Sequence, residues 1–131
     1  MKYLLDTNTC IFLMKNHSKT VARYKENILF GIAISSITLS ELKFGVYNSI
    51  YPEQNGESLL CFLIGVEILD YDSKAADEYG RIRAELRRKG TPIGHMDMLI
   101  AAHAKAKGLT VVTNNTREFE RVENLHLEDW T

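Results

Sequence analysis

Residues 1–10 read MKYLLDTNTC, and this stretch decides the fold because a short apolar run stops abruptly at an acid. The pattern predicts a buried strand over Lys2–Asp6, with Asp6 at its carboxyl end. Either Thr7 or Asn8 can cap a helix that follows directly. The chain therefore opens with a strand that leads straight into a helix.

The same alternation continues to the end of the chain, as apolar, β-branched runs separated by amphipathic stretches. Further strands are predicted at Ile32–Ser35, Glu67–Tyr71 and Leu109–Thr113, and helices at Ser18–Phe30, Thr38–Ile50, Pro52–Gly65, Ser73–Lys89 and His95–Lys107. A helical turn around Arg117–Arg121 and an extended Leu125–Leu127 close the sequence. Strands joined by long helical crossovers indicate an α/β fold with a parallel sheet. We expect one domain over residues 1–131.

Composition limits the function classes. The chain has 131 residues, 45% hydrophobic and 25% charged, which is typical of a globular protein. We find neither a secretory signal nor a run of about 20 apolar residues that could span a membrane. Cys10 and Cys61 have apolar neighbours and no metal-type spacing, so we expect buried, reduced thiols and a cytoplasmic protein. A net charge of −1 gives no general attraction to nucleic acid.

Acidic residues recur where such a fold would place a site. Asp6 follows the first strand, Glu41 lies one turn into the helix after the second, and Asp97 lies in the first turn of a later helix. Asn114 and Asn115 follow the fourth strand. Ligands of open parallel sheets bind outside the carboxyl ends of the strands. Converging carboxylates repel unless a cation joins them, and Mg²⁺ prefers carboxylate oxygen. The pattern therefore favours metal-dependent phosphodiester hydrolysis, with one ion or two.

Each of these residues also has a local explanation. Thr38 to Glu41 fits a capping box, in which the glutamate bonds to the start of its own helix. Asp97 suits the positive end of a helix dipole, and Asp6 is a good helix cap. The two asparagines suit a turn. Only the joint placement of the acids at strand ends favours a site.

Other chemistries find little support. The four histidines show no paired spacing, and there is no glycine-rich phosphate loop or nucleophile elbow. A phosphoacceptor module of the receiver type would need adjacent acids near the first strand end and a lysine after a late strand. Leu5 precedes Asp6, and Asn114-Asn115 stand in place of that lysine.

Four segments in order resemble the PIN-domain family, and specifically the VapC toxins of bacterial toxin–antitoxin pairs. They are MKYLLDTNTC at Met1–Cys10, ISSITLSELKFG at Ile34–Gly45, GTPIGHMDMLIAAHA at Gly90–Ala104, and VVTNNTREF at Val111–Phe119 with LEDW at Leu127–Trp130. The resemblance implies a three-layer α/β fold with a central, mostly parallel sheet of four to five strands flanked by helices. It also implies a Mg²⁺-dependent endoribonuclease, with Mn²⁺ as a substitute ion.

The resemblance assigns residues as well. Asp6, Glu41 and Asp97 take the three acidic metal positions, and Asn115 stands where many PIN domains carry a fourth acid. Glu118 is the alternative fourth residue. Thr113 is expected to support the site through a hydrogen bond.

The resemblance further implies cleavage of structured RNA, with tRNA favoured over ribosomal RNA and the initiator tRNA anticodon loop as the leading hypothesis. Translation would stop, and a cognate VapB antitoxin would neutralise the toxin within an assembly that contains a toxin homodimer. Residues 81–89 are rich in basic side chains, and the candidate RNA-binding residues among them are Arg81, Arg83, Arg87 and Arg88. A solvated helix face explains this basic stretch equally well. A PIN module that only binds, without catalysis, remains the competing reading.

Overall fold

Five short strands form one parallel sheet in the computed structural model, which describes residues 1–131. The order across the sheet is β3-β2-β1-β4-β5, so the first strand is central and the chain winds outward from it in both directions. The strands are β1 Tyr3–Leu5, β2 Ile32–Ser35, β3 Glu67–Leu69, β4 Thr110–Val112 and β5 Leu127–Glu128. Tyr3 pairs with Ile32 on one side and Thr110 on the other. The α/β prediction with a parallel sheet is confirmed.

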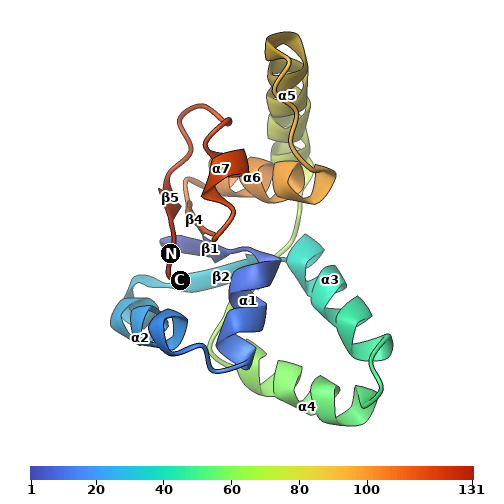
Figure 1. Cartoon of the computed structure of the whole chain (residues 1–131). Helices are drawn as coiled ribbons and strands as arrows, with labels where there is room; N and C mark the ends of the chain where they lie inside the picture. The colour runs from blue at the N-terminus through green and yellow to red at the C-terminus, as the bar shows by residue number, and fades with distance from the viewer.

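Helices cover both faces of this sheet (Figure 1). They are α1 Thr7–Met14, α2 Ser18–Asn27, α3 Ser36–Tyr47, α4 Pro52–Leu63, α5 Ser73–Lys89, α6 His95–Lys107 and α7 Thr116–Phe119, with a 3₁₀ turn at Ile28–Phe30. Helices α5 to α7 lie on one side of the sheet, whereas α1, α2 and α4 lie on the other (Figure 1). The resulting three layers agree with the expected architecture.

Two apolar cores hold the layers together, one on each face of the sheet. Leu4, Ala33 and Val111 belong to a cluster with residues of α5, α6 and α7. Their neighbours along the strands, such as Leu5 and Ile34, belong to a second cluster with residues of α1, α3 and α4. Successive strand residues point to opposite faces, so a continuously apolar strand is what a sheet buried on both faces requires.

Two helix starts differ from the prediction. The helix expected at Thr38 begins at Ser36, because the Ser35 hydroxyl accepts the hydrogen bond of the Ile37 amide. The capping-box reading of Thr38 and Glu41 is therefore wrong, since Thr38 already lies inside the helix. Likewise Asp6 caps α1, rather than Thr7 or Asn8.

The expectation for the cysteines is half wrong. Cys10 is buried in α1, where burial raises the pKa of its thiol well above the ordinary range. Cys61 is exposed on the outer face of α4. Its apolar neighbours misled the prediction, because on this short helix Leu59 is buried while Leu60 also faces outward.

The winding direction of the chain changes between β1 and β4. The carboxyl ends of these two strands lie at the same edge of the sheet. The chain leaves β1 toward β2 and β3, then crosses through α5 and α6 to pair β4 on the other side of β1. In open parallel sheets such a switch point opens a crevice for ligands. Asp6 and Thr113 immediately follow these two strands. Separately, no helix has both the length and the apolar character needed to cross a membrane.

Candidate active site at the carboxyl edge of the sheet

Asp6 lies deepest among the acids at this edge. Its side chain, 5% exposed, accepts a hydrogen bond from the Thr9 amide at 2.8 Å, and its own amide donates to the Val112 carbonyl at 3.0 Å. Burial raises the pKa of Asp6, hydrogen bonds from Thr113 and Thr9 oppose that rise, and the charge of Glu41 adds to it. The carboxylate is thus held by the first turn of α1, and the backbone of Asp6 is fixed to β4.

Glu41 reaches the same edge from α3. The Thr7 hydroxyl donates a 2.6 Å hydrogen bond to Oε1 of Glu41, across 34 positions of sequence. Thr7 is the first residue of α1 and adjoins Asp6. This bond links the helix starts that follow β1 and β2 and holds the half-buried Glu41 carboxylate beside Asp6.

Asp97 joins the site from the first turn of α6, as predicted. The Asn115 side-chain amide donates to Oδ2 of Asp97 and to Oε2 of Glu118, both at 3.0 Å. The Asn115 backbone amide in turn donates to the Thr113 hydroxyl at 2.9 Å. Asn115 therefore bridges two acids, and Thr113 anchors the bridge to the end of β4.

Asp97 and Glu118 influence each other's titration. Burial, followed by the contact with Glu118 and its charge, raises the pKa of Asp97 to about 7, and Asp6 contributes further. The pKa of Glu118 is lowered, first through its interaction with Asp97. Asp97, the more buried partner, is therefore the carboxyl whose charged form is disfavoured. A hard divalent cation would stabilise the charged form of both groups.

Each of the four carboxylates lies within reach of the charge of at least one other. Glu41 acts on Asp6, and both Asp6 and Glu118 act on Asp97. No three Asp, Glu, His or Cys side chains are gathered closely enough to hold a metal ion. Thr7 contacts Oε1 of Glu41 and Asn115 contacts Oδ2 of Asp97, so the second oxygen of each carboxylate is available to a cation while these hydrogen bonds persist. The carboxylate donor chemistry fits Mg²⁺, and binding would draw the acids closer together.

The four candidate arginines do not act as one patch. Arg83 and Arg87 line a hollow that also includes His95 and Met98, next to Asp97 on α6. Arg81 and Arg88 line a different hollow on α5. Arg81 is also paired with Asp77 at 3.1 Å. The structure therefore separates the two pairs, and only Arg83 and Arg87 share a hollow with residues from the first turn of α6.

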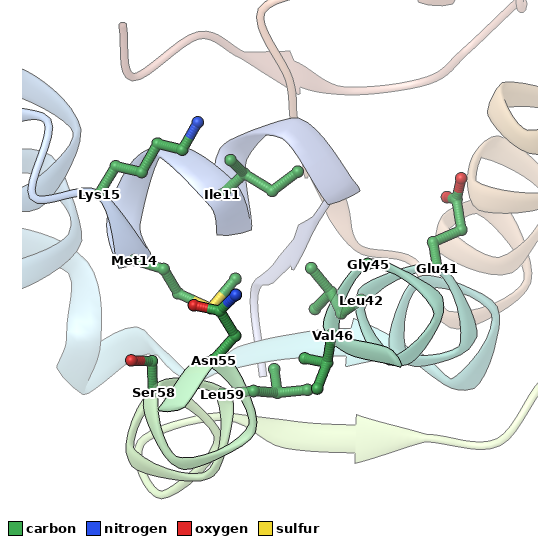
Figure 2. A pocket seen from close by; sticks show the side chains of 10 residues that line it. All are labelled: Ile11, Met14, Lys15, Glu41, Leu42, Gly45, Val46, Asn55, Ser58 and Leu59. Atoms are coloured by element: carbon green, nitrogen blue, oxygen red, sulfur yellow. The ribbon is translucent and has the colours of Figure 1, made fainter. Parts of the chain in front are cut away.

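An apolar groove leads up to Glu41 from the opposite side (Figure 2). Its volume is about 380 Å³, and α1, α3 and α4 form its walls. Met14, Leu42, Val46 and Leu59 converge in its floor, whereas the Glu41 carboxylate stands at one end and points away from them (Figure 2). The groove thus combines an apolar floor with an acidic end.

Sequence reasoning missed the role of Thr7, which was considered only as a helix cap. The Thr7–Glu41 bond joins two helices from separate βα units, and no local pattern indicates such a contact. His95 was dismissed because it lacks paired histidine spacing. Its partner is instead the Tyr79 hydroxyl, 3.0 Å from Nδ1, on the preceding helix.

Comparisons with known proteins agree with this geometry. Residues 3–125 match the model of the PIN domain family. The chain is 49% identical over 130 residues to the tRNA(fMet)-specific endonuclease VapC of Salmonella typhimurium, covering 99% of this chain and 98% of the relative. It is 46% identical over 132 residues to ribonuclease VapC2 of Rickettsia felis, covering 99% and 98%. Among solved structures, the DNA-bound VapBC of Salmonella typhimurium matches with a TM-score of 0.94 and 50% identity, over 100% of this chain and 99% of that one.

Proposed function

Because the chain belongs to the PIN domain family, among its VapC ribonucleases, we propose that it is a Mg²⁺-dependent endoribonuclease that cleaves tRNA. The observation that carries the proposal is the series of neighbouring carboxylates at the switch point of the sheet, in which Glu41 acts on Asp6 and both Asp6 and Glu118 act on Asp97. The relative named for tRNA(fMet) favours the initiator tRNA as substrate. Cleavage there would stop translation in the cytoplasm.

Asp6, Glu41 and Asp97 would hold the metal, and Glu118 would complete the set. When bound, Mg²⁺ supplies Lewis-acid stabilisation of phosphate charge and an activated water. The chain's own residues have separate tasks. Thr7 orients Glu41, and the Asn115 amide holds Asp97 and Glu118 at a fixed spacing. Asn115 is thus an orienting group in this proposal, and Glu118 is the fourth acid.

The test is cleavage of purified tRNA(fMet) with and without Mg²⁺. Asp6→Asn and Asp97→Asn should lower the cleavage rate at least about a hundredfold, because the metal's contribution amounts to several kcal/mol. Asparagine keeps the helix-cap acceptor that Asp6 provides, so D6N should stay folded. Glu120→Gln is the matched control, since it removes an exposed acid two residues from Glu118. Equal cleavage by wild type, D6N and D97N would exclude the enzyme and leave a PIN module that only binds.

A second part of the proposal concerns control by a VapB antitoxin, the partner with which the similar Salmonella structure was solved. The apolar groove between α1, α3 and α4 suits an amphipathic segment of such a partner. Its acidic end at Glu41 suits a basic side chain, which would neutralise the cleft directly. We therefore expect an inactive toxin–antitoxin assembly that contains a toxin homodimer.

Co-expression with the antitoxin from the same operon tests this assignment. The two chains should co-purify, and cleavage of tRNA should return once the antitoxin is removed. Val46→Glu would place a charge at a partly buried position in the floor of the groove and should weaken co-purification. Growth that is unrestrained when the toxin is expressed alone would contradict the toxin assignment.

A further inference from the structure

A chain of hydrogen bonds connects α5 to the first residue of α6, beside the acids. The Arg83 guanidinium donates to the Tyr79 hydroxyl at 3.1 Å, and that hydroxyl lies 3.0 Å from Nδ1 of His95. Arginine can only donate, so the hydroxyl accepts from Arg83 and its own proton can go to Nδ1. The three exposed or half-exposed side chains are therefore held in one orientation.

Arg83 and His95, the two ends of this hydrogen-bond chain, border a hollow of about 450 Å³ with a basic rim and an apolar floor. Arg83, Arg87 and His95 stand on the rim, and the buried Ile93 and Met98 lie below. The volume falls within the ~300–1,000 Å³ range of small-molecule sites. Neither arginine takes part in any of the six ion pairs of the structure, so both guanidinium groups have donors to spare.

The hollow and the acid site share one wall, the first turn of α6. His95 and Met98 face the hollow, while Asp97 between them faces the acids. One helical turn has a pitch of about 5.4 Å, so the residues of α6 that line the hollow lie within one turn of Asp97 along the helix axis. The loop before α6 is fixed as well, because Arg121 donates to the Pro92 carbonyl at 2.8 Å.

We propose that this hollow is a nucleotide subsite, in which Arg83 and Arg87 bind a phosphate next to the scissile one and His95, held in place by Tyr79, positions the nucleotide that carries it. The inference rests on the proposed ribonuclease function and specifies its substrate contact. Guanidinium groups suit phosphate oxygens through charge-assisted hydrogen bonds, and aromatic rings suit the unstacked bases of RNA loops. Arg81 and Arg88 have no such role, because they lie in a separate hollow of α5 and Arg81 is already paired with Asp77.

The experiment compares two double variants of the same helix that lose the same charge. Arg83→Gln with Arg87→Gln should raise the KM for tRNA about tenfold or more, with kcat within about twofold, since two charge-assisted contacts are lost. Arg81→Gln with Arg88→Gln should leave both constants near wild type. Tyr79→Phe keeps the ring but releases Arg83 and His95, so its KM should rise by a smaller factor.

A binding measurement separates this subsite from the catalytic assignment, because it requires no cleavage. A fluorescently labelled anticodon stem-loop RNA of tRNA(fMet) is titrated in EDTA at several salt concentrations. The slope of log Kd against log salt should fall by roughly 0.7 per arginine in the R83Q/R87Q variant and stay unchanged in R81Q/R88Q. This result would support the subsite even for a protein that fails to cleave. The proposed subsite is overturned if both double variants lose RNA affinity equally. It is also overturned if R83Q/R87Q binds RNA as wild type does but no longer co-purifies with the antitoxin.

Discussion

Replacing Thr7 by valine tests whether the hydrogen bond between α1 and α3 sets the position of Glu41. Valine has nearly the shape of threonine, so Thr7→Val removes the hydroxyl that donates to Glu41 without opening a cavity. The bond length of 2.6 Å is typical of a hydroxyl that donates to an ionised carboxylate. A bond of that kind contributes about 1.5–3 kcal/mol to whatever state it favours.

If Glu41 binds the metal as proposed, the favoured state is the orientation of its carboxylate, not the fold as a whole. Glu41 is half-buried, so water can replace the lost donor in the variant. We therefore expect the free energy of unfolding to change by less than about 1 kcal/mol. Loss of a group that orients a metal ligand typically lowers metal affinity 10- to 100-fold, so the Mg²⁺ concentration for half-maximal cleavage should rise by about that factor.

The assay is tRNA cleavage at increasing Mg²⁺ concentration, with urea unfolding as the stability measurement. High Mg²⁺ should restore most of the T7V rate, because the ligands themselves remain. Thr7→Ser keeps the hydroxyl and should behave like wild type. The reasoning is refuted if T7V keeps the wild-type Mg²⁺ dependence, or if T7S is impaired as much as T7V.

Two further predictions concern stability. Gly31→Ala should lower the free energy of unfolding by more than about 1 kcal/mol, because Gly31 has a φ of +88° and an added Cβ would lie 2.8 Å from the Met1 Cα. Gly80→Ala should raise it by about 0.5–1 kcal/mol, since that Cβ would meet open space on a helix; urea titrations that show the same sign for both variants would contradict this contrast. Lys107 and the cap bond lower the pKa of Asp72 from 3.8 to about 2, so the pair stabilises the fold fully above pH about 4 and loses that effect as the pH falls toward 2. Asp72→Asn keeps the cap acceptor, so its melting temperature should lie below that of wild type by a constant amount from pH 5 to 8, and the gap should close in acid; a gap that persists at pH 2 would disprove the assignment.

Much of the fold was predictable because its signals are local. The apolar run before Asp6, the β-branched run at Ile32–Ser35 and the amphipathic period of Ser73–Lys89 each specify their own element. Boundaries were less well determined. The helix expected at Thr38 begins at Ser36, since Ser35 at the end of a strand can serve as a cap and Thr38 packs inside. Cys61 was misplaced for a related reason, because composition does not specify which side of a helix faces the core.

The candidate site also has one part that local sequence signals predict and another that depends on tertiary contacts. Their expected position near strand ends was enough to identify Asp6, Glu41 and Asp97 as candidate site residues, because the carboxyl ends of parallel strands lie at one edge of the sheet. The bridge that Asn115 makes between Asp97 and Glu118 could not be predicted, since it joins two acids from different helices. The sequence likewise did not predict that the four candidate arginines line two separate hollows.

The sequence by itself determined the order of strands and helices and which acids end up at the carboxyl edge, because periodicity and strand ends are properties of neighbouring residues. Only the tertiary structure decided what those acids contact. Thr7 and Glu41 lie 34 positions apart, Asn115 and Asp97 lie 18 apart, and Tyr79 and His95 meet across a helix pair. Such pairings depend on how helices pack against a common sheet, and packing arises from the whole chain at once.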